Sequence, residues 1–365
     1  MSMRKSRLFR TLVNVSLMAL AFGLLGWTVW SNRGQIREVM EARPDGRLFA
    51  VGFALYLSAL LLTFLRWFFL VRALGLPFRL TDATRLGFIG NVFNLVIPGA
   101  VGGDLIKAAF LCREQERKTQ AVASMVIDRI VGLLGLFVLA SMAGALAWGT
   151  APGPVRNLVL LAWAAVVAGL VGLAVLFTPA LYRPLHRLLS GRGRVGAIFD
   201  ELVAMAAVYR TRLWTIAGCL ALAVVSHSLF VGAFAVVDHA LYPTSAPSVA
   251  RHYIIVPLAL FTMAVPLPFG ALGLTEQASE TLFELVGFPG GAVAMMGYRV
   301  LMYAGGLVSL LVYLANARQV RSLRSQAEAL ETDLEQGTIG TEPATSGIPS
   351  ASPDPHRQAG PSGAR

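Results

Sequence analysis

The sequence predicts an all-α polytopic integral membrane protein with six full spans and two re-entrant helical hairpins in an inverted repeat. Hydrophobic residues make up 56% of the 365 residues and charged residues only 14%, with a mean hydropathy of +0.64. A soluble domain carries about 25% charged residues. About eight apolar segments alternate with arginine-containing connections, and Gly/Pro-rich sequence interrupts two of them. Such interruptions are tolerated at membrane depth only inside protein or beside a wet cavity.

The first segment follows a basic N-terminus, residues 1–10. The apolar run at 11–30 is too long for a typical signal-peptide core, so we expect an anchoring helix. The remaining apolar segments follow along the chain at 48–71, 86–111, 121–148, 157–178, 213–240, 252–286 and 292–315. The membrane domain therefore covers 11–318, with halves at about 11–148 and 157–315. The polar, Pro/Ser/Gly-rich stretch at 319–365 is predicted to be a largely disordered cytoplasmic tail.

Arginines set the expected orientation. They are dense before residue 11, at 72–85, at 113–118, across 183–212 and after 318, but sparse at 149–156 and 241–251. The positive-inside rule makes the dense set cytoplasmic, so we expect both termini inside a cell (inner) membrane. Segment 86–111 then enters and returns on the cytoplasmic side, and segment 252–286 on the external side. The alternative is a bundle of eight spans in which both segments are ordinary Pro-kinked helices.

The net charge of +11 is almost entirely arginine, because lysine occurs only at Lys5, Lys107 and Lys118. Its placement between apolar segments favours membrane lipids as partners and no nucleic acid. Cys112 and Cys219 lack metal-ligand spacing, so we expect no metal and no cofactor. No arrangement typical of a hydrolase or metalloenzyme is present in the sequence, and we expect no catalytic residues.

The two interrupted segments carry the candidate structural residues. Polar side chains and turn-forming residues there would satisfy backbone groups that a broken helix leaves unpaired. In the first segment these are Asn91, Asn94, Pro98, Gly99, Gly102 and Gly103; in the second they are Pro266, Pro268, Gly270, Gly273 and Thr275.

Charged residues inside apolar segments are the candidate binding residues, because each costs about 2.5–3.5 kcal/mol at the bilayer centre. We expect Arg129 to point inward, to a lipid phosphate or to a carboxylate. Arg66 and Arg299 are candidates either for snorkelling to an interface or, above all for Arg66, for binding. Acidic residues either cap a restarted helix or hold a cation or arginine. The candidate substrate-binding set is Asp104, Arg129, Glu276, Lys107, Arg66 and Glu280.

Three motifs resemble signatures of one family in the same order. They are Asn91 to Asp104 (NVFNLVIPGAVGGD), Asp128 to Leu133 (DRIVGL) and Pro266 to Glu276 (PLPFGALGLTE). The resemblance is to the lysylphosphatidylglycerol synthase transmembrane-domain, or flippase-like, family, and it covers about residues 10–318. It implies a stand-alone membrane member without the soluble domain that attaches an amino acid.

The resemblance implies a protein that moves a phospholipid or another lipid-linked headgroup between leaflets. The expected ligand is an anionic phospholipid or a polyprenyl-phosphate-linked lipid. The alternative is a membrane enzyme, or a non-transporting partner subunit of a separate lipid-modifying or glycosyltransferase enzyme. The sequence does not determine the oligomeric state.

Overall fold

The computed structural model describes residues 2–96, 102–114, 118–149, 151, 153–189, 203, 206–265 and 267–317. Across these residues the secondary structure is helical, with no strand, in agreement with the predicted fold class. Pro98, Gly99, Pro266 and the predicted tail at 319–365 lie outside the described residues.

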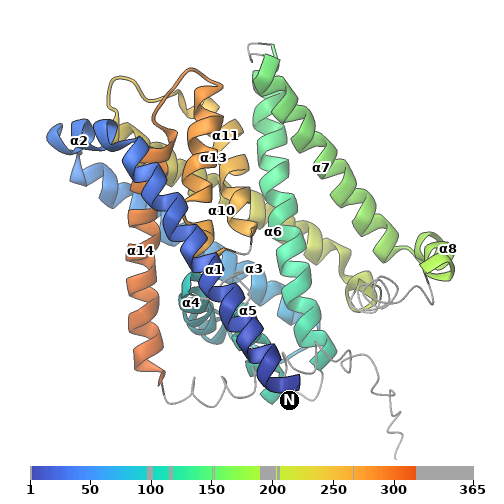
Figure 1. Cartoon of the computed structure of the whole chain (residues 1–365). Coiled ribbons are helices and arrows are strands. Elements are labelled where there is room, and N and C mark those ends of the chain that lie inside the picture. The colour runs from blue at the N-terminus through green and yellow to red at the C-terminus, as the bar shows by residue number, and fades with distance from the viewer. Residues whose placement is uncertain are drawn as a thin grey trace, which may run out of the picture.

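Long helices account for most of the membrane domain (Figure 1). Among the described residues, five helices are long and apolar enough to cross a membrane: α3, α6, α7, α10 and α14. A sixth crossing is obtained if α1 and α2, which meet at a bend of 65°, are counted as one span. The bounds of these helices are α1 Ser2–Ser31, α2 Arg33–Glu41, α3 Gly46–Ala73, α6 Lys118–Ala147, α7 Gly153–Phe177, α10 Leu213–Leu241 and α14 Gly291–Ala315. The protein is therefore a multi-pass membrane protein.

The two interrupted segments form pairs of shorter helices. Segment 86–111 is divided between α4 (Leu80–Val96) and α5 (Gly102–Glu114), which pack against each other. Segment 252–286 is divided between α11 (Val249–Phe261) and α13 (Leu274–Glu284), joined through the short helices η2 (Thr262–Ala264) and α12 (Pro268–Ala271). In Figure 1 the pair α4–α5 lies toward the end of the bundle where the N-terminus is drawn, and α11–α13 toward the opposite end. Two further helices are α8 (Pro179–Leu189) and η1 (Arg210–Arg212).

Two sets of helices make equivalent contacts around a central pair, α3 and α10. α4 packs against α3 and α14, and α11 packs against α10 and α6. Each helix that follows a short pair, α6 or α14, also contacts the second member of that pair, α5 or α13. Exchanging α3, α4, α5 and α6 for α10, α11, α13 and α14 therefore reproduces the same set of contacts. α12 also lies against α4, so the two interrupted segments meet inside the bundle.

The first helix extends beyond the apolar run: α1 begins at Ser2 and contains residues 11–30. Of the two roles left open for Arg66 and Arg299, burial disfavours snorkelling to an interface: they are only 6% and 3% exposed, and they pair with the half-buried Asp128 and the fully buried Glu276, respectively. A paired arginine can stay inside a membrane protein because its partner offsets much of the desolvation cost.

Candidate functional site

A cavity of about 390 Å³ lies among α3, α4, α5, α6, α10, α11, η2 and α14. One part of its wall is charged, with side chains from three helices: Arg66, Asp104, Lys107, Asp128 and Arg129. The rest is largely apolar and aromatic, and includes Tyr56, Phe64, Leu133, Leu136, Phe230 and Phe261. Four of the six predicted binding residues, Arg66, Asp104, Lys107 and Arg129, line this one cavity. An amphiphilic ligand suits a wall divided in this way.

Arg66 of α3 and Asp128 of α6 form a two-point ion pair. Arg66 Nε donates to Asp128 Oδ1 at 2.7 Å and Nη2 donates to Oδ2 at 3.2 Å. The guanidinium lies over Gly132, where a Cβ atom would stand 3.1 Å from Nη2. The absence of a side chain at Gly132 therefore leaves the room that Arg66 occupies. Asp128 and Gly132 can act together because residues four apart lie on one face of a helix.

Asp104, in the first turn of α5, holds two cations in the same cavity. Arg129 Nε donates to Asp104 Oδ2 at 2.5 Å, and Lys107 Nζ lies 3.6 Å from Asp104 Oδ1. The Lys107 ammonium also stands 5.1 Å from the ring centroid of Trp67. The arginine side chain is 43% exposed, whereas those of Asp104 and Lys107 are 16% and 10% exposed. Arg129 is therefore the cation of this cluster with the most accessible surface.

The predicted structural residues of the first interrupted segment hold α4 close to α5. Asn94 Oδ1 accepts a hydrogen bond from Gly103 N at 2.9 Å, and Asn91 Nδ2 donates to Ser309 Oγ of α14 at 3.0 Å. A Cβ at Gly103 would lie 2.1 Å from the carbonyl oxygen of Gly90, so only glycine fits this approach. Gly102 is the first residue of α5.

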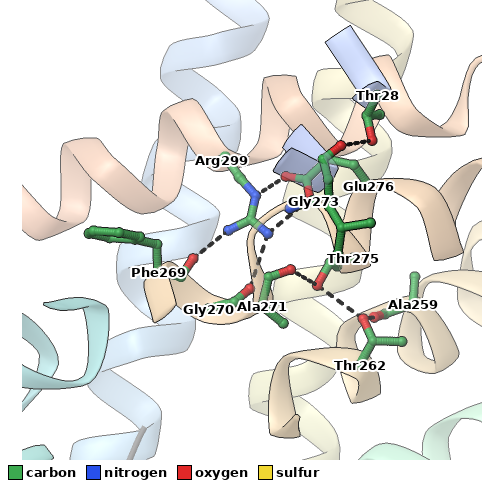
Figure 2. A network of polar contacts seen from close by, with 11 residues as sticks. Thr28, Ala259, Thr262, Phe269, Gly270, Ala271, Gly273, Thr275, Glu276 and Arg299 are labelled. Atoms are coloured by element: carbon green, nitrogen blue, oxygen red, sulfur yellow. Dashed lines mark hydrogen bonds and ion pairs between the residues drawn. The ribbon is translucent and has the colours of Figure 1, made fainter. Parts of the chain in front are cut away.

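Glu276 belongs to a different cluster, shown in Figure 2. Arg299 of α14 pairs with both carboxylate oxygens of Glu276, and Nη2 does so at 3.2 Å. The same guanidinium donates to the carbonyls of Phe269 at 2.8 Å and Gly270 at 3.0 Å. Glu276 also accepts from Gly273 N at 2.7 Å, as a capping residue does. The carboxylate is fully buried, and together Glu276 and Arg299 hold the interrupted backbone in place. We call this pair of residues the clasp.

The clasp stabilises a backbone that is unusual at four positions. Phe269, Gly270, Ala271 and Gly273 all have positive φ, between 53° and 83°. A Cβ at Gly273 would also lie 2.4 Å from Leu24 of α1. Thr275 Oγ1 donates to the Ala271 carbonyl at 3.2 Å and accepts from Thr262 at 3.0 Å. Pro268 begins α12 at this point.

The three glutamates of α13 do not make one acidic site. Glu276 is engaged by Arg299, Glu280 Oε2 accepts from Ala292 N at 2.7 Å, and Glu284 is exposed. Glu276 and Arg299 line a second cavity of about 580 Å³ whose other lining residues are mainly apolar. The structure thus separates Glu276 and Glu280 from the four predicted residues of the first cavity.

Sequence reasoning did not assign three residues that matter here. Asp128, Arg299 and His227 are not in the candidate substrate-binding set. His227 Nε2 is 3.0 Å from the Gly132 carbonyl oxygen, at the cavity that also holds Arg66. The signal was present for Asp128, since a carboxylate inside an apolar segment needs a cation.

The comparisons with known proteins give one family. Residues 7–311 match the model described as the lysylphosphatidylglycerol synthase TM region. No curated protein and no solved structure matches the chain. The match covers most of the chain, including the interrupted segments and the charged cavity. The chain belongs to the lysylphosphatidylglycerol synthase TM region family.

Proposed function

We propose that this protein is a lipid translocase that binds a lipid-linked anionic headgroup and moves it between leaflets. The ligand is an anionic phospholipid or a polyprenyl-phosphate-linked lipid. One observation carries the proposal: the cavity of about 390 Å³ joins a charged wall to an apolar, aromatic wall. A headgroup fits the first environment and the start of a hydrocarbon chain fits the second.

The charges of the cavity favour a phosphate. Among the described residues that line it, Arg66, Lys107 and Arg129 carry positive charge against the carboxylates of Asp104 and Asp128. One positive charge is in excess, which matches the single negative charge of a phosphodiester. Arginine binds phosphate oxygens in pairs through its planar fork. Arg129, the most exposed of the three cations, is the residue that first meets the phosphate.

The architecture supports alternating access. We propose that α1, α3, α6, α7, α10 and α14 are the six full spans, and that α4–α5 and α11–α13 are re-entrant hairpins. The reciprocal packing of the two sets of helices supports an inverted repeat, a plan on which transporters place substrate sites at broken helices. Movement of one half against the other then exposes the cavity to each leaflet in turn. Both termini are cytoplasmic in this proposal, at the cell membrane.

Cysteine accessibility tests this topology. Single cysteines at Leu80, Val249 and Glu284, all exposed helix-end positions, are placed in a background without Cys112 and Cys219. An impermeant thiol reagent should label position 80 only from the cytoplasm, and positions 249 and 284 only from outside. Labelling of 249 and 284 from opposite sides would show a plain spanning segment and remove the second hairpin.

Translocation of fluorescent phosphatidylglycerol in proteoliposomes tests the function. Arg129→Gln removes one charged hydrogen-bond donor, worth about 1.5–3 kcal/mol, so we expect the rate to fall by roughly 10- to 150-fold. Arg85→Gln is the control, because Arg85 lies on α4 outside the cavity and pairs with Asp82 at 3.0 Å. Equal rates in the wild type and Arg129→Gln would refute the site assignment.

The same vesicles separate translocation from the alternatives. We propose that the chain is not itself an enzyme, so the labelled lipid should be recovered chemically unchanged. Conversion of the lipid would favour a membrane enzyme. If the pure protein neither moves nor converts any tested lipid, the partner-subunit alternative is favoured, with a separate lipid-modifying enzyme as its partner.

A further inference from the structure

Two buried titratable side chains join α10 to α11 outside the charged cavity. Asp238 of α10 and His252 of α11 are both fully buried, and His252 Nε2 lies 2.8 Å from Asp238 Oδ2. The other ring nitrogen, His252 Nδ1, lies 3.1 Å from the Ser248 carbonyl oxygen. Neither side chain lines the charged cavity. The pair is therefore an ionisable site that the proposed lipid site does not use.

The two contacts of the His252 ring require one proton more than a neutral imidazole and a carboxylate carry. A carbonyl oxygen only accepts, so Nδ1 carries a proton and donates it to Ser248. In a neutral ring Nε2 would then turn a lone pair toward the carboxylate of Asp238, which also accepts. A second proton must therefore lie between Nε2 and Oδ2. The contact forms with this proton and is repulsive without it.

Two buried polar atoms at this site have no hydrogen-bond partner among the described residues. They are Oδ1 of Asp238 and the hydroxyl of Tyr242, one turn further along the chain. Burial and the carboxylates of Asp238, Glu280 and Glu38 raise the pKa of Tyr242, so the phenol keeps its proton. A buried oxygen without a partner costs about 1–3 kcal/mol. A pair that served stability alone would be expected to have this oxygen satisfied.

The charged side chains on the helices around the pair have partners of their own. α10 packs against α3, α6, α11 and α14, and α11 packs against α6 and α13. Ion pairs on these helices join Arg66 to Asp128, Arg129 to Asp104 and Arg299 to Glu276. The other titratable or charged groups around the pair are Tyr242, Glu38, His239, Arg251 and Glu280.

Three of these last groups are held by backbone atoms. The His239 ring lies 5.8 Å from that of His252, but its Nδ1 contacts the Ala235 carbonyl at 2.8 Å. Arg251 donates to the Val286 carbonyl at 3.3 Å. Glu280 accepts from the Ala292 N–H at 2.7 Å. Among the described residues, the extra proton is therefore shared by His252 and Asp238 alone.

The helices that carry the pair also form part of the charged cavity. Further along α10, His227 and Phe230 line the cavity, and further along α11, Leu260 and Phe261 do so. α10 belongs to the central pair of helices, whereas α11 is the first arm of the second interrupted segment. Loss of the proton removes the attraction that holds α11 to α10 at their shared end. The position of one cavity wall thus depends on whether the pair holds its proton.

We propose that Asp238 and His252 form a proton-binding site that couples lipid movement to proton movement. The pair takes one proton from water as α11 closes on α10 and returns one proton to water as the two helices separate. No other bond is made or broken. Uptake from one side of the membrane and release to the other carries one proton for each lipid. This inference rests on the proposed function and adds the ion that drives it.

A pH gradient across proteoliposomes tests the coupling. The full-length protein is reconstituted with a trace of fluorescent phosphatidylglycerol, and potassium with valinomycin holds the membrane potential at zero. A difference of about one pH unit is a tenfold ratio of proton activity, so one proton per lipid shifts the leaflet ratio of the label by up to about tenfold. Quenching of the outer leaflet by dithionite measures this ratio. A protonophore should return it to about one.

Asp238→Asn separates the proton from the hydrogen bond. The amide donates to Nε2 of a neutral His252, so the contact forms without the extra proton. This variant should still exchange the lipid, but its leaflet ratio should stay near one under the gradient.

Tyr253→Phe is the matched control. Tyr253 joins the same two helices through neutral hydrogen bonds, accepting from the Ser228 hydroxyl at 3.0 Å and donating to the Ser228 carbonyl at 3.1 Å. It should keep the gradient response of the wild type. The gradient measurement on the wild type stands even if Asp238→Asn fails to fold.

The outcomes separate this inference from the proposed function. Lipid exchange in the wild type that ignores the gradient would leave the translocase standing and refute the coupling. A wild-type response that persists unchanged in Asp238→Asn would refute this pair as the proton site. If the label does not exchange with or without a gradient, the proposed function fails and the coupling fails with it.

Discussion

Replacing Arg299 by methionine tests whether the clasp of Figure 2 holds the second interrupted segment in place. The substitution keeps a long apolar stem and removes the guanidinium. Among the described residues, the fully buried carboxylate of Glu276 then keeps the Gly273 N–H as its one hydrogen-bond partner. Leaving one member of a buried ion pair uncompensated costs about 3–5 kcal/mol. The carbonyls of Phe269 and Gly270 also lose their donor, at about 1 kcal/mol each.

We therefore expect Arg299→Met to lower the free energy of unfolding by at least about 4 kcal/mol. Unfolding by SDS titration in mixed micelles, followed by circular dichroism, measures this quantity. Arg37→Met is the matched control. Arg37 and Glu41 form an exposed pair, 82% and 66% exposed, and such a pair contributes about 0–1 kcal/mol.

A double variant sharpens the test. Glu276→Gln removes the charge that Arg299→Met leaves unpaired, so the double variant should be less destabilised than the sum of the two single variants. A coupling of about 2 kcal/mol or more is expected for groups in direct contact. A loss below about 1 kcal/mol in Arg299→Met, equal to that of the exposed control, would refute the clasp.

Two further predictions concern packing and a second buried pair. Gly103→Ala places a methyl group 2.1 Å from the Gly90 carbonyl oxygen and should lower the free energy of unfolding by about 1–3 kcal/mol. In the control Gly218→Ala the added methyl group meets nothing within 4 Å, so this change should be neutral or stabilising. SDS titration measures both variants, and equal effects would contradict the close approach of α4 and α5. His252→Leu removes the imidazole that lies 2.8 Å from the fully buried carboxylate of Asp238 and should lower the free energy of unfolding by about 3–5 kcal/mol. Asp238→Asn keeps a hydrogen-bonding oxygen and should lower it by less. Thermal unfolding of the purified protein ranks the two variants, and a larger loss in Asp238→Asn would contradict an ion pair.

Hydropathy alone located the long helices. Segments 48–71, 121–148, 157–178, 213–240 and 292–315 correspond to helices α3, α6, α7, α10 and α14. This part is predictable because each backbone in a bilayer must satisfy its own hydrogen bonds, so a long apolar run becomes a helix whatever surrounds it. The interruptions were also local signals, since proline and glycine end a helix without help from distant residues.

Charge partners were only partly predictable. The sequence predicted a carboxylate or a lipid phosphate as the partner of Arg129, and the structure joins this residue to the carboxylate of Asp104 at 2.5 Å. It gave no partner for Arg66, whose carboxylate, Asp128, is 62 residues away. It left Glu276 open between a helix cap, a partner of an arginine and a ligand for substrate, and the structure joins it to Arg299.

The sequence by itself thus determined that the chain is helical, where its helices break and which charges must lie inside. The tertiary structure decided which charges pair and which remain free to meet a ligand. The sequence alone does not specify which buried arginine forms an ion pair with which buried carboxylate. The choice between them depends on which helix faces meet, and that is set by the close packing of apolar side chains over the whole bundle.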